Sequence, residues 1–309
     1  MIRRAMVVCL SAVLVACGGG DDTDAGGDGG NGGTGSRVHR YAEFATASGT
    51  ADFRTQLNTQ GALGYRYVGL PGYPGASRTL FVNDAAVAYT YEVLATPTTP
   101  VAFVDQVKAQ GLRGFRLASY DDRGVVYRKV TNSTETFTYE AVDSVDHRGL
   151  PYATFVANVN ARGAAGFRLH SELIFGGVFF DLYEKSSTPA TYAVRVEDVA
   201  ATESAQLARF DTNGQAGYRM RGIHAFAEGD LWVFERDTTK ANEKATFRYF
   251  ADPLVASAAA LVTQANGQGA SGRGLEGQMN LPGGVARDLY FLAANCSGVL
   301  CDVRGPSGQ

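Results

Sequence analysis

An arginine follows a glycine and an aromatic residue at four places spaced about 50 residues apart. Guanidinium groups bind carboxylates and phosphates through paired N–H donors, so arginines gathered on one surface could bind an anion. The alternative, which we favour, is that each arginine forms a structural ion pair with a carboxylate on an adjacent strand, such as Glu43, Glu92 or Glu140. A degenerate fifth copy has Gly274 in place of the arginine, and the four arginines are Arg66, Arg116, Arg168 and Arg219.

Two cysteines, Cys296 and Cys301, lie near the end of the chain. If the chain is exported, an oxidising compartment favours a disulfide between them, and the intervening residues can turn back far enough to allow it. Such a small loop stabilises a fold by about 2 kcal/mol in the chain-entropy model. The alternative is a reactive thiol, which would be needed if Cys296 were an enzymatic nucleophile.

The segment Gly267-Gln-Gly269-Ala-Ser-Gly272 matches the glycine spacing of a dinucleotide-binding loop. That loop requires a strand before it and a helix after it. Here the pattern predicts a helix before and a strand after, so we expect no nucleotide cofactor.

The histidines give no sign of a metal or catalytic site. They are His39, His147, His170 and His224, and their spacing is not that of metal ligands. The chain also lacks a Walker sequence and a nucleophile-elbow motif. We therefore expect no metal, no cofactor and, on balance, no enzymatic activity.

The N-terminus has the anatomy of an export signal. Two arginines precede an apolar run from Ala5 to Val15, which as a helix reaches about 16 Å and is too short to cross a bilayer. The end of the run, Leu14-Val15-Ala16-Cys17, resembles the lipobox of bacterial lipoproteins. That resemblance implies a signal peptide over 1–16, cleavage before Cys17, and acylation of this cysteine, including palmitate. Gly18 follows it, where inner-membrane lipoproteins of enterobacteria carry Asp, so in a Gram-negative cell the outer membrane is the expected destination.

Residues 17–36 predict a flexible tether because Gly, Asp and other small polar residues dominate them. The whole chain has 28 Lys and Arg against 31 Asp and Glu and no basic stripe. Nucleic acid is therefore not an expected partner, and we expect contact with the membrane only through the N-terminal lipid.

The rest of the chain is a fivefold repeat. Each copy has a tyrosine in a strand-like stretch, an apolar pair at helical spacing, the segment Gly-x-x-Gly-aromatic-Arg, and a closing apolar strand. We place the repeats at 37–84, 85–133, 134–187, 188–240 and 241–295, followed by a tail at 296–309. The first glycines of the segments are Gly61, Gly111, Gly163, Gly214 and Gly269.

These features predict an α+β protein of five βαββ units. We expect the first glycine to end the helix in a left-handed conformation, and the second to let the chain turn into the next strand. The aromatic residue should then enter the core under the helix, with the arginine on the opposite face. The second and third strands should form a hairpin.

The repeat resembles a small, uncharacterised bacterial domain family, which has Tyr-Glu in its first strand and then Leu-Asn-x-x-Gly-x-x-Gly-Trp. Leu57-Asn58-Thr-Gln-Gly61-Ala-Leu-Gly64-Tyr65 matches most of this motif, and the copy at 159–167 matches more loosely. Tyr or Phe replaces the Trp, and the fifth copy has no aromatic residue there. The resemblance implies no activity.

Third strands that are apolar on both faces predict that one face packs on a helix and the other on a neighbouring unit. Five such units could close into a fivefold pseudosymmetric ring, by analogy with the pentein β/α-propellers. Paired or beaded units are the alternative. We expect an envelope protein that binds or scaffolds an unidentified protein, peptide or glycan. The alternative is an enzyme with a site at the repeat junctions or ring centre, of hydrolase or guanidine-modifying type.

Overall fold

The computed structural model describes residues 37–73, 77–83, 87–143 and 149–304, all of which belong to one unit. The predicted signal peptide, the predicted lipidation site at Cys17 and the tether up to Ser36 lie outside the described residues. No helix in the described ranges is long and apolar enough to cross a membrane.

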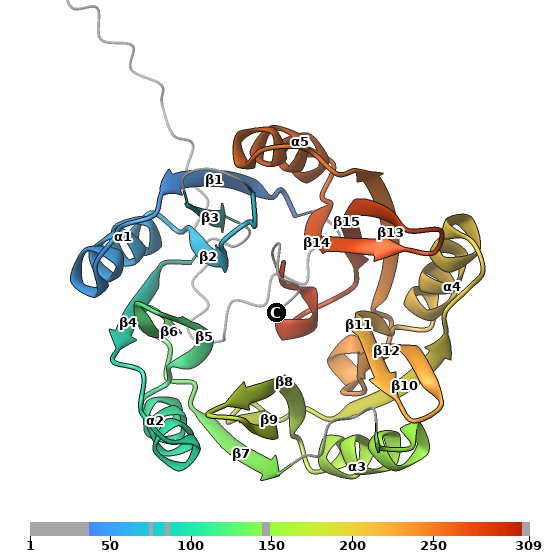
Figure 1. Ribbon diagram of the computed structural model, residues 1–309, viewed down its shortest axis with the longest axis horizontal. Helices are drawn as coiled ribbons and strands as arrows, with labels where there is room; N and C mark the ends of the chain where they lie inside the picture. Colours follow the sequence, from blue (N-terminus) through green and yellow to red (C-terminus); the bar gives the residue numbers. More distant parts are fainter. Residues whose placement is uncertain (1–36, 74–76, 84–86, 144–148, 305–309) are drawn as a thin grey trace, which may run out of the picture. The chain divides into compact units, whose positions relative to one another are not determined.

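The order strand, helix, strand, strand occurs five times along the chain (Figure 1). The described residues thus form an α+β protein with five α-helices and five small antiparallel sheets, as the repeat predicted. The elements are β1 (Arg40–Ala45), α1 (Thr50–Ala62), β2 (Arg66–Gly69) and β3 (Arg78–Asn83); β4 (Tyr89–Leu94), α2 (Pro100–Leu112), β5 (Arg116–Asp121) and β6 (Gly124–Val130); β7 (Phe137–Asp143), α3 (Tyr152–Ala164), β8 (Arg168–Phe175) and β9 (Val178–Ser186); β10 (Tyr192–Asp198), α4 (Glu203–Gln215), β11 (Arg219–Phe226) and β12 (Gly229–Asp237); β13 (Thr246–Pro253), α5 (Ala258–Ala270), β14 (Gly274–Leu281) and β15 (Val285–Ala294).

Every sheet places the third strand of its unit between the first and the second. The second and third strands form the predicted hairpin, as in β2 and β3, where Tyr67 lies opposite Phe81. In each second strand one residue has no partner on the third strand, which makes a β-bulge. A bulge bends its strand and changes the direction of its side chains. The five bulge residues are Val68, Ala118, His170, Arg221 and Glu276.

The two recurrent glycines have different roles from those that the sequence suggested. The prediction that the first glycine adopts a left-handed conformation is wrong, since Gly61 lies within α1 and has no positive φ. The left-handed residue is the second glycine, Gly64, with a φ of 82°. This is the position after the helix where a side chain would be strained. The equivalent glycines with positive φ are Gly114, Gly166, Gly217 and Gly272.

The first glycine instead lets each helix touch the backbone of another unit. A Cβ atom on Gly61 would lie 2.3 Å from the carbonyl oxygen of Tyr89 in the next unit, so no side chain fits there. A Cβ atom on Gly269 would likewise lie 2.1 Å from the carbonyl oxygen of His39, which belongs to the first unit. The other close pairs are Gly111 with Phe137, Gly163 with Tyr192, and Gly214 with Phe247.

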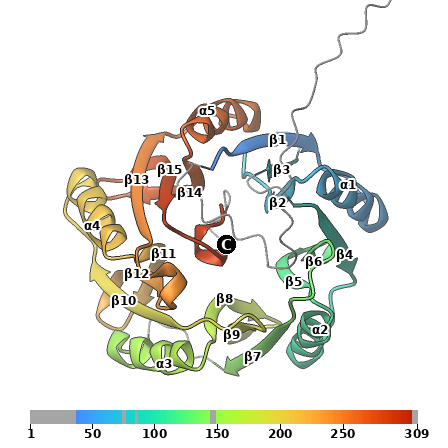
Figure 2. The ribbon, with the colours of Figure 1, turned by 180° about the vertical axis from the view of Figure 1, so that it is seen from behind.

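Hydrogen bonds from a helix side chain hold the same contact. The amide of Asn58 in α1 accepts from the backbone N–H of Tyr91 and donates to its carbonyl, at 2.9 and 3.0 Å. Asn266 in α5 makes the same pair of bonds with Tyr41, at 2.7 and 3.1 Å. Figures 1 and 2 both place α5 beside β1. The asparagine of the Leu-Asn motif therefore joins a helix to the first strand of another unit.

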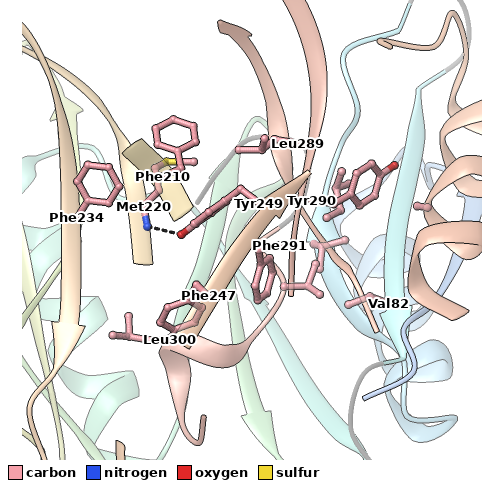
Figure 3. Close-up of a cluster of buried hydrophobic side chains, with 14 of the residues drawn as sticks. Val82, Phe210, Met220, Phe234, Phe247, Tyr249, Leu289, Tyr290, Phe291 and Leu300 are labelled. Atoms are coloured by element: carbon pink, nitrogen blue, oxygen red, sulfur yellow. Dashed lines mark hydrogen bonds between the residues drawn. The ribbon is translucent and has the colours of Figure 1, made fainter. Parts of the chain in front are cut away.

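The recurrent tyrosine adds a second link between units. Its hydroxyl accepts a hydrogen bond from the backbone of a second strand, as from Met220 to Tyr249 at 2.7 Å (Figure 3). The fourth unit departs from this pattern. Gly163 approaches Tyr192 itself, and Asn160 binds the backbone of Val194, so Val194 stands where the other units have the linking tyrosine. The equivalent bonds run from Tyr67 to Tyr91, from Leu117 to Tyr139 and from Leu275 to Tyr41.

The hydrophobic core is shared between units, as the two apolar faces of the third strands predicted. One cluster joins Phe210 of α4 to Tyr249 and Phe291 of the fifth unit and to Val82 of the first (Figure 3). The expectation that the aromatic residue before each arginine enters the core is correct only for Phe115, which is buried. Its counterparts are half-buried, and the arginines themselves are more deeply buried than expected. The partly exposed residues are Tyr65, Phe167 and Tyr218.

Candidate anion-binding cavity

The recurrent arginines each begin the second strand of their unit, namely β2, β5, β8 and β11. Arg219 is fully buried, and Arg66 and Arg168 are 5% and 7% exposed. Because a buried guanidinium is stable only with partners, the first question is what each of them contacts.

Carboxylates on other strands are the partners of three of these arginines. Arg116 donates to Glu184 of the next unit, with Nε to Oε2 at 3.1 Å. Arg168 lies 3.8 Å from Glu184 and 3.7 Å from Glu235, and Arg219 donates to Glu276 at 2.8 Å. The structural ion pairs that we favoured are therefore present at three of the four arginines.

The carboxylates proposed from the sequence are different ones. Glu92 pairs with Arg113 at 2.6 Å, Glu43 lies 3.7 Å from Arg78, and Glu140 is exposed. Arg168 and Glu184 lie opposite each other within one sheet. The other pairs join different units, whereas the sequence argument assumed neighbours within one sheet. Strand alternation alone could not identify them.

The C-terminal segment, residues 296–304, supplies the remaining partners of the recurrent arginines. Arg219 donates to the carbonyl oxygens of Leu300 and Asp302, at 2.6 and 2.5 Å, and Arg66 donates to that of Val303 at 2.9 Å. A disulfide joins Cys296 and Cys301, whose Cα atoms are 5.8 Å apart, as predicted. The segment lies among the second strands of the units (Figure 1). It thus occupies part of the space onto which the arginines face.

A cavity of about 120 Å³ remains beside the segment. Its lining includes one carboxylate, Asp302, and an unusual number of guanidinium groups. The lining arginines are Arg66, Arg116, Arg128, Arg168, Arg221 and Arg304.

Arg128 differs from the other arginines of the cavity. It forms no hydrogen bond or ion pair with any described residue, and its nearest partner is the ring of Tyr89, 5.7 Å from its guanidinium carbon. Burial, reinforced by the charge of Arg66, lowers its pKa. An unpaired guanidinium beside other cations is stabilised when an anion binds.

Two further arginines are anchored to backbone as well as to carboxylates. Arg221 donates to the carbonyl of Leu169 at 2.8 Å and lies 3.4 Å from Glu235. Arg304 donates to the carbonyl of Met220 at 2.9 Å and lies 3.2 Å from Glu276. Burial lowers the pKa of Arg221 to about 10 and that of Arg304 well below its usual value. The charges of Arg168 and Arg219 lower both pKa values further.

The carboxylate Glu184 shows the opposite effect. Burial alone would raise its pKa, but Arg116, His170 and Arg168 together hold that pKa below its usual range. Glu184 therefore stays ionised and neutralises part of the arginine charge. The paired arginines still outnumber their carboxylates, and the unpaired Arg128 adds to the surplus of positive charge.

Of the described histidines, His170 and His224 both line a second cavity, whereas His39 precedes β1. The Nε2 atom of His170 donates to the carbonyl of Leu117 at 3.1 Å, and its Nδ1 shares a hydrogen bond with the hydroxyl of Ser171 at 3.0 Å. Burial lowers the pKa of His170 to about 4. His224 pairs with Glu172. The backbone N–H of His39, just before β1, donates to the carbonyl of Gly269. His147 is outside the described residues. No group of three or more potential ligands that could hold a metal ion is found in the described ranges. Cys296, being disulfide-bonded, offers no thiolate for guanidine chemistry.

Gly267 and Gly269 lie inside α5, and β14 follows Gly272. The helix therefore precedes the glycine segment, and the strand follows it, as the sequence predicted. This order is the reverse of a dinucleotide-binding loop.

Sequence reasoning missed several charged residues in and around the cavity. Arg128, Glu184 and Glu235 occupy equivalent places on the third strands, opposite the recurrent arginines of their own units. Arg221 and Glu276 are bulge residues, as is His170. The available signal was a charged residue within an otherwise apolar strand, as where Glu235 follows Leu231 to Phe234. Such a residue in a buried strand indicates a buried partner.

Comparison of the chain with protein-family models, with curated proteins and with solved structures finds no match.

Proposed function

We propose that this chain is a lipid-anchored envelope protein that binds a small anion in the arginine-lined cavity. The observation that carries the proposal is Arg128, a guanidinium without a described ion-pair or hydrogen-bond partner beside Arg66 and Arg116. Arg128 is half-buried in the lining. Charges that are partly removed from water are normally paired, so an unpaired one facing a cavity favours an anionic ligand.

The assembly that creates the cavity is, in our proposal, a closed fivefold pseudosymmetric ring. The contacts of α5 with β1 support this, because Gly269, Asn266 and Tyr41 repeat the contacts that join α1 to β4. Closure would face all second strands toward one region and gather their arginines there. The C-terminal segment would then fill part of the centre.

Anchoring rests on the lipobox-like end of the N-terminal segment. A Cys17→Ser variant should lose palmitate labelling and leave the membrane fraction, because each buried methylene contributes about 0.8 kcal/mol to membrane binding. A variant that still incorporates palmitate and stays in the membrane would contradict the proposed anchor. Crosslinking in the native envelope, followed by mass spectrometry, would identify any protein, peptide or glycan that the protein contacts.

Anion binding can be tested on the full chain purified in detergent. Thermal unfolding is followed while acetate, benzoate, phosphate or sulfate is titrated at constant ionic strength. At least one anion should raise the melting temperature in a saturable manner, because a ligand of the folded state stabilises it by mass action.

The Arg128→Gln variant should lose this response. Arg78→Gln is the matched control, because Arg78 also lies on a third strand but is 42% exposed and pairs with Glu43 at 3.7 Å. If no anion stabilises the wild type, or if both variants respond like it, the proposed function is wrong.

A further inference from the structure

The cavity has a charged part and an apolar part. Five consecutive residues of β5, from Arg116 to Tyr120, line it. A strand rises about 3.3 Å per residue, so this wall is about 13 Å long. Arg66, Arg116 and Arg168 stand at the starts of their strands, whereas Tyr120 and Leu173 stand four and five residues further along.

Apolar side chains line part of the wall. Leu117 follows Arg116 at the start of β5, and Leu173 lies further along β8. Leu117 and Leu173 keep 6% and 7% of their surface exposed, whereas Val303 of the C-terminal segment is almost fully covered and only borders the cavity. Apolar surface of this kind gains about 25 cal/mol for each Å² that a ligand removes from water. A fully hydrated inorganic ion cannot use this surface.

The size of the cavity limits the ligand. At about 120 Å³ it is slightly smaller than engineered apolar cavities of about 150 Å³ that bind benzene. A ligand whose apolar body is about the size of one small ring or a short branched chain would fill it.

The charge balance limits the ligand further. Arg116, Arg168, Arg221 and Arg304 have carboxylate partners in Glu184, Glu235 and Glu276. Arg128 has none among the described residues. The paired arginines thus share three carboxylates, and Arg128 adds to the surplus of positive charge. The planar fork of its unpaired guanidinium matches a carboxylate.

We infer that the ligand is a small organic monocarboxylate with a compact apolar body. Its carboxylate would bind Arg128, near Arg66 and Arg116, and its apolar body would lie against Leu117, Leu173 and Val303. This inference rests on the proposed anion-binding function and specifies its ligand.

The test compares matched ligands by calorimetry and thermal unfolding of the full chain in detergent. Benzoate and 3-methylbutanoate should bind at least tenfold more tightly than acetate, a difference of about 1.4 kcal/mol, because they bury apolar surface. Benzamide, which has the ring of benzoate without its charge, should bind at least tenfold more weakly than benzoate.

Variants separate the two parts of the cavity. Arg128→Gln should abolish benzoate binding, whereas Leu173→Ala should weaken benzoate severalfold and leave acetate unchanged. Arg78→Gln should bind benzoate like the wild type. A melting temperature close to that of the wild type, measured without ligand, shows for each variant that the fold is intact.

The possible results separate the inferred ligand class from the proposed anion-binding function. If phosphate or sulfate binds through Arg128 and the carboxylates do not, the inferred ligand class is wrong and the anion site stands. If acetate binds as tightly as benzoate, the apolar wall has no part in recognition and the inference also fails. If no anion binds, both proposals fail.

Discussion

Gly274 lies so close to Val303 that a Cβ atom on it would be 2.7 Å from the Cγ2 atom of the valine. Gly274 begins β14 at the position where the other four units have their recurrent arginine. The C-terminal segment fills the space that a fifth arginine would need. The degenerate fifth repeat is therefore adapted to the segment that covers it.

Replacing Gly274 tests this packing. The Gly274→Ala variant should be destabilised by about 1–3 kcal/mol, because the new Cβ would also lie 2.8 Å from the ring of Phe291, and overpacking strains a core. Chemical denaturation measures the change. Gly267→Ala is the control, since nothing lies within 4 Å of its Cβ position and alanine favours a helix by up to ~1 kcal/mol. Equal stability of the two variants would argue against the close packing of the segment.

The disulfide should stabilise the C-terminal segment. Replacing both Cys296 and Cys301 by serine should lower the free energy of unfolding by about 2 kcal/mol, because the link closes a loop that is short in sequence. A reducing agent should lower the melting temperature of the wild type and leave the double variant unchanged. A wild type whose stability is insensitive to reduction would show that the segment is held by its arginine contacts alone.

If the ring is closed, Asn160 and Asn266 should contribute equally to the stability of the fold. Asn160→Ala removes bonds between α3 and Val194, and Asn266→Ala removes the equivalent bonds between α5 and Tyr41. Each variant should lose about 1–3 kcal/mol, because buried backbone groups lose their partners. If units are beaded or paired instead, Asn266→Ala should be nearly neutral while Asn160→Ala is not. Denaturant midpoints of the two variants decide between these arrangements.

His170 should make the protein less stable in mild acid. Its pKa is lowered to about 4 in the fold by burial and by Arg168 and Arg116, against 6.5 for an ordinary histidine, while Glu184 acts in the opposite direction. The unfolded chain therefore binds the proton first, and stability is lost as the pH falls from 7 to 5, by about 2 kcal/mol. Above pH 5 Glu184 stays ionised in both states, so it does not contribute.

The His170→Gln variant should show a correspondingly flatter stability between pH 7 and pH 5. Urea denaturation at several pH values, with wild type and variant in parallel, gives the two slopes. Identical slopes would mean that His170 is protonated as easily in the fold as in the unfolded chain.

The sequence by itself determined the units of this fold. The recurring glycines, the apolar pairs at helical spacing and the closing apolar strands predicted five βαββ repeats, and these features act within about 50 residues. The close spacing of Cys296 and Cys301 likewise allowed their disulfide to be predicted. Local periodicity suffices for such features because each depends on backbone geometry near the residue concerned.

Only the tertiary structure decided the role of the asparagine and glycine that recur in the repeats. From the sequence, Gly61 and Asn58 are expected to form the end of a helix. In the structure they contact the backbone of Tyr89 and Tyr91 in another unit. An amphipathic helix has the same sequence whether it packs on its own sheet or also on its neighbour's.

The cavity depends even more strongly on distant residues. Arg116 meets Glu184, and Arg66 meets Val303, across separations of 68 and 237 residues. Arg128 is unpaired because the strands around it place other arginines, rather than carboxylates, within its reach. Charge pairing is set by distance in space, which no local pattern encodes, so the sequence could name the arginines but not their partners.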